Sequence, residues 1–309
     1  MSPQRKAALL SVAAGVVTLL LKFGAYFLTG SVGLLSDATE SLVNLTAAIV
    51  AFTAISIAAR PPDTSHHYGH EKAEYFSSGL EGGLILAAAA GIIYAALPRL
   101  FHPAPLHNVD VGLLIALAAS LVNLVVARIL LHVGRQVDSI ALVADAEHLM
   151  TDVWTSVGVV VGVALTWLTG WYILDPLIAL AVALHIVTVG IQLVRRSIEG
   201  LMDRALPAEE IALIQRVIAE EAGPETPYHA LRTRKSGPRR FVELHLLVPG
   251  TLTVKQAHDL AERIEQRLRR ELPNSVVTIH VEPVEDRASW DADEVGGLTG
   301  PGEARPDDA

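Results

Sequence analysis

The chain has 309 residues, of which 51% are hydrophobic and 18% charged, with a formal net charge of −9 and a mean hydropathy of +0.41. This composition indicates a membrane protein rather than one soluble domain, and no basic patch with interleaved aromatic residues predicts binding to nucleic acid. Cysteine is absent, which excludes a disulfide framework and any thiolate site for a soft metal ion.

Six apolar stretches fill the first two thirds of the chain, each near or above the length of about 20 residues that a membrane-spanning helix needs. They are residues 7–29, 32–59, 73–98, 110–134, 137–169 and 173–198. The first is not expected to be a cleaved signal peptide, because it is long, contains Lys22 and is followed directly by the second.

Basic residues concentrate on one side of the predicted spans. The opposite loops carry almost none, with Arg99 as the exception. Because cytoplasmic loops are enriched in lysine and arginine, we expect a multi-pass inner-membrane protein with both termini in the cytoplasm. The basic residues that set this orientation are Arg5, Lys6, Arg60, Lys72, Arg135, Arg195, Arg196 and Arg204.

The second span contains Glu40 and Asn44. A spacing of four residues puts both side chains on one face of a helix, one turn apart. Ionisable groups are costly within a membrane and usually face a bundle interior or a water-filled path. Asp37, three residues before Glu40, is a candidate for supporting hydrogen bonds or a proton relay.

The loop after the second span contains Asp63, His66, His67 and His70. An aspartate followed by histidines three and seven positions later offers the carboxylate and nitrogen ligands that Zn²⁺ prefers. His67 is the weakest candidate, because its neighbours already have the favourable spacing. The alternative is a solvated, histidine-rich loop at the membrane surface.

The fifth span contains His148 and Asp152, again four residues apart, with Asp145 three residues before His148. If the polar faces of the second and fifth spans meet, they present oxygen and nitrogen ligands to a divalent cation. Hydrogen bonding between helices is the alternative, but it explains serine and asparagine better than glutamate, histidine and several aspartates. Since imidazole binds metal when neutral and titrates near neutral pH, protons would compete with metal at His148.

After about residue 204 the pattern changes from membrane-spanning to soluble. Helices are predicted at 207–222 and 253–271, and strands at 229–235, 241–248 and 276–282. The order α-β-β-α-β predicts a small cytosolic α+β domain of metallochaperone-like type, with both helices on one face of the sheet. The predicted domains are therefore 1–204, 205–285 and a disordered acidic tail, 286–309.

Several potential metal ligands lie in the predicted cytosolic domain. Each alone is readily explained as a partly buried polar residue; taken together, a metal site and this explanation stand equally open. They are His229, His245, His258, His280 and Glu282.

The quoted residues resemble the cation diffusion facilitator family over roughly 7–285. The resemblance rests on Ser31 to Asp37 leading into Glu40 and Asn44, on His66 to Glu74, on Ala144 and Asp145 leading into His148 and Asp152, and on Leu231 to Gly237.

The resemblance implies a homodimeric exporter that exchanges divalent metal ions for protons by alternating access. Glu40, Asn44, His148 and Asp152 would form its transport site. Asp63, His66 and His70 match the family's loop site. The five cytosolic ligands fall where some members bind regulatory zinc, so the metal would be both substrate and regulator. Lys72 and Asp203 fall where the family has an ion pair between its membrane and cytosolic parts.

One departure concerns the metal. Zinc transporters of this family usually carry aspartate or histidine at the positions of Glu40 and Asn44, so the oxygen-rich set here admits Fe²⁺, Co²⁺, Mn²⁺, Ni²⁺ or Cd²⁺ besides Zn²⁺. A metal sensor or scaffold that binds without transport is the alternative function. A membrane hydrolase using His70 and Glu71 is disfavoured, because the fifth position of its motif is Glu74 rather than histidine.

Overall fold

The computed structural model describes residues 2–29, 32–101, 110–224, 226–290 and 298. The chain divides into two compact units, Met1–Glu199 and Gly200–Ala309. Within the described residues, six long helices follow the predicted spans closely, which confirms a polytopic helical domain. They are α1 (Pro3–Thr29), α2 (Val32–Ala58), α3 (Ala73–Phe101), α4 (Asp110–Gln136), α5 (Ile140–Thr169) and α6 (Leu174–Leu201).

Within the described ranges, α1, α2, α3, α4 and α6 each contain a stretch long and apolar enough to cross a membrane. The first half of α5 instead carries Asp145, Glu147, His148 and Asp152. These polar residues make α5 the main candidate for carrying chemistry.

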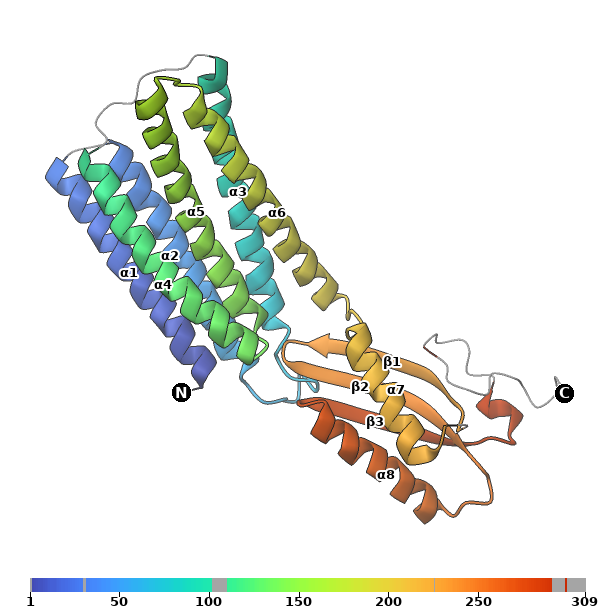
Figure 1. Ribbon diagram of the computed structural model, residues 1–309. Helices are drawn as coiled ribbons and strands as arrows, with labels where there is room; N and C mark the ends of the chain where they lie inside the picture. Colours follow the sequence, from blue (N-terminus) through green and yellow to red (C-terminus); the bar gives the residue numbers. More distant parts are fainter. Residues whose placement is uncertain (1, 30–31, 102–109, 225, 291–297, 299–309) are drawn as a thin grey trace. The chain divides into compact units, whose positions relative to one another are not determined.

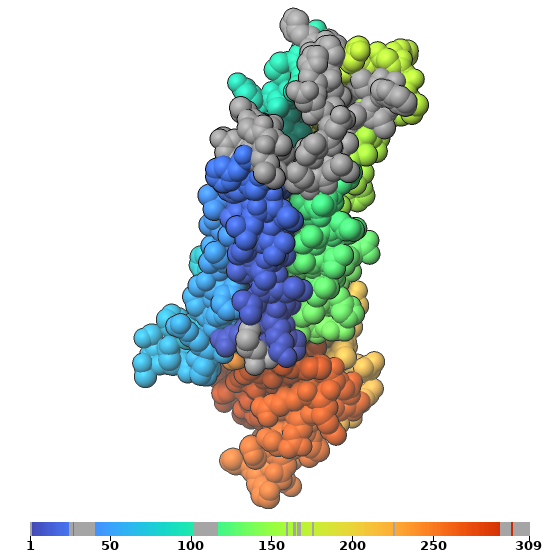
Figure 2. Space-filling view, turned by 90° about the vertical axis from the view of Figure 1, so that its left-hand side faces the viewer, coloured from blue at the N-terminus to red at the C-terminus, as the bar shows by residue number. Residues whose placement is uncertain are grey.

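The helices of the first unit run side by side (Figure 1). α1, α2, α4 and α5 form one group, and Figure 2 shows α1 in blue beside α4 in green. α3 and α6 pack on each other through small residues. A Cβ added at Gly190 would come within 2.8 Å of Leu86, so only glycine permits this close approach.

The second unit is built on a sheet in the order β1-β2-β3 (Figure 1). β1 (Tyr228–Ser236) and β2 (Arg239–Val248) form an antiparallel hairpin, and β3 (Ser275–Pro283) lies parallel to β2. Helices α7 (Ala208–Ala222) and α8 (Val254–Glu271) complete the predicted α-β-β-α-β order. The prediction of an α+β domain is confirmed.

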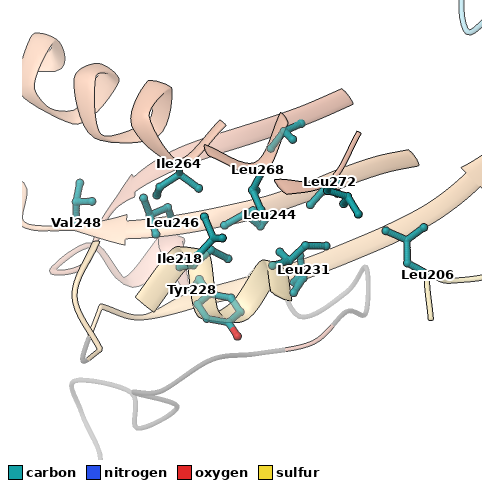
Figure 3. Packing of buried hydrophobic residues seen from close by; sticks show 14 residues of the cluster. Leu206, Ile218, Tyr228, Leu231, Leu244, Leu246, Val248, Ile264, Leu268 and Leu272 are labelled. Carbon is teal, nitrogen blue, oxygen red and sulfur yellow. The ribbon is translucent and has the colours of Figure 1, made fainter. Parts of the chain in front are cut away.

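A single apolar cluster joins both helices to one face of this sheet (Figure 3). From β2 it takes Val242, Leu244, Leu246 and Val248. Because successive side chains of a strand point to opposite faces, His245 lies on the face away from the helices. Other buried members are Leu206, Ile214, Val217, Ile218, Tyr228, Leu231, Ile264, Leu268, Leu272 and Val277.

Part of the predicted tail is described. Arg287–Ser289 form a short 3₁₀ turn, and the Trp290 ring N–H donates to the carbonyl oxygen of Val284 at 2.9 Å. Leu298 pairs with Leu231 through two backbone hydrogen bonds of 3.0 Å. The tail residues 291–297 and 299–309 lie outside the described residues.

Candidate metal sites

The first cluster lies between the polar faces of α2 and α5. The Asn44 amide donates to Asp152 Oδ2 at 2.5 Å, and Asn44 Oδ1 lies 2.9 Å from His148 Nε2. Because an amide oxygen only accepts, His148 Nε2 carries the proton of this bond. His148 is 5% exposed, and its Nδ1 has no hydrogen-bond partner among the described residues. Three of the four predicted ligands are therefore in direct contact.

The remaining predicted residues of this cluster are Glu40 and its neighbour Asp37. Both belong to α2, but their side chains lie outside the described residues. Glu40 precedes Asn44 by one helical turn, so the backbone puts it on the same face of α2 as Asn44.

The second cluster is in the loop between α2 and α3. Asp63 Oδ1 lies 3.3 Å from His66 Nδ1, and Asp63 Oδ2 lies 3.3 Å from His70 Nε2. Two ligand atoms that share a tetrahedral Zn²⁺ are about 3.3 Å apart, given bonds of about 2.0 Å. One ligand atom from each residue fits within a common radius typical of a metal site. His67 is exposed and lies outside this group.

Backbone groups of the loop orient the Asp63 carboxylate and favour its charged form. Backbone N–H groups of Ser65 and His66 donate to Asp63 Oδ1 at 2.8 and 2.7 Å. These bonds hold the pKa of the Asp63 carboxyl below its usual range. Gly69 takes a φ of +90°, and a Cβ there would collide with the Glu71 carboxylate.

The third cluster lies on the sheet face away from α7 and α8. His229 pairs in register with His245, and His245 with His280. Glu282 joins them: its Oε2 lies 2.9 Å from His229 Nε2, and its Oε1 lies 3.3 Å from both His245 Nδ1 and His280 Nε2. His229, His245 and Glu282 form the compact ligand group, with His280 at its edge.

Local geometry suits these groups to metal. The register shift after His229 accompanies a positive φ of 51° at Ala230, which is the form of a β-bulge and re-aims neighbouring side chains. Burial, partly offset by Glu282, lowers the pKa of the His245 imidazole. The neutral imidazole that results is the form that binds metal.

Two further predictions, the ligand His258 and the ion pair of Lys72 with Asp203, lie outside these clusters. His258 is on α8 and lines, together with Glu282, a cavity of about 460 Å³, but it is not part of the compact ligand group. Asp203 Oδ1 lies 3.3 Å from Arg234 Nη1 within the second unit. Lys72 belongs to the first unit, so its pairing with Asp203 stays a prediction.

Comparison with known proteins decides the family. A model described as "Cation efflux transmembrane domain" matches residues 8–202, and one described as "Cation efflux protein, cytoplasmic domain" matches residues 206–284. The chain belongs to the cation efflux, or cation diffusion facilitator, family.

Individual relatives agree with this assignment. An uncharacterized transporter of Synechocystis, sll1263, is 51% identical over 286 residues, covering 93% of this chain and 92% of the relative. The cation-efflux pump FieF of Pectobacterium atrosepticum is 34% identical over 278 residues, covering 90% and 92%. A solved structure from work on CzrB, named there as a proposed zinc transporter, is 42% identical over 25% of this chain and 96% of its own, with a TM-score of 0.24.

As a cation efflux protein, the chain is a multi-pass membrane transporter of divalent metal ions and not an enzyme. Its sequence-based analysis missed Asn123 of α4, whose amide donates to Asp152 Oδ2 at 3.1 Å. Asn123 is 7% exposed. The signal that could have found it is an asparagine in an otherwise apolar span, three residues after Ser120, whose hydroxyl lies 2.5 Å from that of Ser156 on α5.

Proposed function

We propose that the protein exports divalent transition-metal ions from the cytoplasm in exchange for protons, with Zn²⁺ as the first candidate. The contact of Asn44, His148 and Asp152 between α2 and α5 carries this proposal. Ionisable groups gathered inside a helical membrane domain mark an ion or proton path. The membrane would be the inner membrane, with both termini in the cytoplasm.

The proposed mechanism starts from the hydrogen bonds that join Asn44, His148 and Asp152. The side-chain amide of Asn44 forms hydrogen bonds with both His148 and Asp152. An incoming ion would take Asp152 and a neutral His148 as ligands, with Glu40 and the Asn44 oxygen completing the set. The amide of Asn44 must then turn away from Asp152, since its nitrogen cannot bind a cation.

Release would follow alternation of the site to the outside. Protonation of His148 removes the lone pair that binds metal, so a proton entering from outside weakens the site. A neutral amide at Asn44 adds no charge, so the site is less specialised for Zn²⁺ than one with a further carboxylate. Fe²⁺, Co²⁺, Mn²⁺, Ni²⁺ and Cd²⁺ are therefore the competing substrates.

The second unit would join two copies of the chain and sense cytosolic metal. His229, His245 and Glu282 supply three ligand atoms, whereas a structural Zn²⁺ site is almost always closed by four. A fourth ligand from His280, from His258 or from another copy would couple metal binding to the dimer. We propose the homodimer as the transporting form.

The test is metal uptake into proteoliposomes with an imposed pH gradient, with the six metals compared for wild type and for Glu40→Asp/Asn44→Asp. Gradient-dependent uptake with an altered metal preference in the double variant is the expected result. Asp152→Ala should abolish uptake while the dimer stays intact. Metal binding without flux, in protein shown to be correctly inserted, would instead support the sensor or scaffold.

A further inference from the structure

We propose that a buried carboxyl pair, Glu81 of α3 and Asp145 of α5, carries a proton that is exchanged for the metal ion. The inference rests on the proposed antiport and names groups for it outside the metal ligands. It adds a proton-carrying site to the membrane domain, distinct from His148.

The pair is enclosed where α3 and α5 pack together. Glu81 is 0% exposed and Asp145 1% exposed, and the two carboxyl groups are close enough to repel each other. Their neighbours confirm the packing, since Ile85, one turn after Glu81, and Ala144, directly before Asp145, belong to one apolar cluster.

Both carboxyl groups retain an oxygen atom that no described residue satisfies. Glu81 Oε2 and Asp145 Oδ2 have no hydrogen-bond partner among the described residues. Glu81 Oε1 accepts only a long bond, 3.4 Å, from the Ser77 hydroxyl. A buried hydroxyl on another helix is also near: Ser11 Oγ of α1, in a residue 2% exposed, lies beside Asp145.

Such a group of oxygen atoms needs a positive charge. Burying two neighbouring carboxylates without a cation is unfavourable in a membrane interior, so one of them takes up a proton. The facing part of α6 supplies Leu193 and Ser197, which are not ionisable. Along α3 the nearest other titratable groups are Tyr75 and Glu74, and along α5 they are Glu147 and His148; Asp37 and Glu40 of α2 have side chains outside the described residues.

A path connects the pair to the metal ligands. Asp145, His148 and Asp152 are spaced by three and four residues, so they form one stripe along α5. Asp145 is about 4.5 Å from His148 along the helix axis, at a rise of about 1.5 Å per residue. An ion of charge +2 bound at His148 and Asp152 therefore favours loss of the shared proton.

The exchange balances in charge and atoms. When the metal ion binds from the cytoplasm, the O–H bond of the protonated carboxyl breaks and its proton leaves to cytoplasmic water. When the metal ion leaves to the outside, the pair takes one proton from outside water. One proton thus enters for each metal ion through this pair, in addition to any carried by His148.

Glu74 is another buried glutamate on α3, but its carboxyl group has hydrogen-bond partners. Its Oε2 accepts the Ser139 hydroxyl at 2.5 Å and the Ala141 N–H at 3.3 Å. These bonds satisfy the side chain at the start of α5, so Glu74 has a structural role. It is the matched control for a buried carboxyl group on the same helix.

The experiment counts protons moved per metal ion in proteoliposomes that contain a pH dye and a metal dye. Glu81→Gln keeps the side-chain volume and should lower the count by about one, because a coupled pair titrates as a unit. Asp145→Asn is the second variant, in case the first folds poorly. Glu74→Gln should leave the count unchanged. Infrared difference spectra on adding Zn²⁺ to wild type should show loss of a protonated-carboxyl band, which Glu81→Gln removes.

The outcomes separate this inference from the proposed function. If wild type moves metal without any coupling to pH, the antiport itself is wrong. If wild type is coupled and both variants keep its proton count and its infrared band, only the carboxyl pair is wrong. If Glu81→Gln instead loses one bound Zn²⁺ with an unchanged proton count, the pair is a metal site and the proton assignment is overturned.

Discussion

At the scale of single residues, two amides hold the aspartate of the proposed transport site. Asp152 Oδ2 accepts N–H groups from both Asn44 and Asn123. Asn44 must turn for a cation to bind, whereas Asn123 can keep its bond to Asp152 throughout. We therefore expect Asn123 to keep the carboxylate aimed at the proposed site when metal binds.

We expect Asn123→Ala to weaken metal binding roughly 10- to 100-fold, the usual effect of removing a group that orients a ligand. The measurement is Zn²⁺ affinity by calorimetry in detergent, in an Asp63→Ala/Glu282→Gln background that removes the other two proposed sites, with KM and maximal rate from proteoliposome flux. The loss should appear in affinity and KM. Ser120→Ala is the control, because Ser120 lies on the same helix but contacts Ser156. Equal effects of both substitutions would show general disruption of α4 instead.

At the scale of elements, the loop between α2 and α3 shows how a short segment can prepare a ligand set. Its turn places Asp63 against two backbone N–H groups and two histidines. Gly69, next to His70, permits the turn because its φ of +90° is a conformation that residues with a side chain rarely adopt.

Gly69→Ala should strain the loop by about 1–2 kcal/mol, the range for a left-handed residue other than glycine. If that strain is relieved by moving His70, metal affinity at the loop falls about tenfold, since about 1.4 kcal/mol corresponds to one decade. Calorimetry with Zn²⁺ in an Asp152→Ala/Glu282→Gln background, which removes the proposed transport and cytosolic sites, isolates this site. His67→Ala should leave it unchanged, and loss of affinity there would contradict the ligand set proposed here.

The sequence predicts elements better than contacts. Apolar length and strand alternation place all six long helices and the three strands within a few residues of their ends. They cannot show that Asn123 reaches Asp152, because which faces of α4 and α5 meet is decided by packing. For the same reason, a Glu81 within an apolar span gives no hint that its carboxyl group lies against Asp145.

The distance between ligands along the sequence explains why some ligand groups can be predicted and others cannot. Asp63, His66 and His70 lie within one loop, so their proximity follows from the sequence itself. His229, His245 and Glu282 come together through strand register, which the separate strands do not specify. The sequence groups His258 with them by residue type and by the family resemblance, but His258 lies on α8 and shares with Glu282 only the lining of a cavity.

At the scale of the whole molecule, the cytosolic cluster is suited to make dimer stability depend on metal. Glu282 contacts three histidines from three strands, so it is the residue on which the cluster depends. The Glu282 carboxylate offsets the positive charge of the three imidazoles when they are protonated. With metal it is a ligand, and binding energy then stabilises whichever state completes the site.

In an Asp63→Ala/Asp152→Ala background, which removes the proposed loop and transport sites, Zn²⁺ should therefore raise the thermal unfolding temperature of the full-length protein in detergent. Glu282→Gln should abolish that rise. At a Zn²⁺ concentration of about 100 times Kd the expected stabilisation is about 2.7 kcal/mol. Glu265→Gln is the control, because Glu265 pairs with Arg269 on the surface of α8. The dimer fraction is measured in parallel by mass-resolved chromatography. If Glu282→Gln keeps both the Zn²⁺-dependent rise and the Zn²⁺-dependent dimer fraction, the cytosolic unit does not sense metal through this cluster, and its role is limited to joining the two copies.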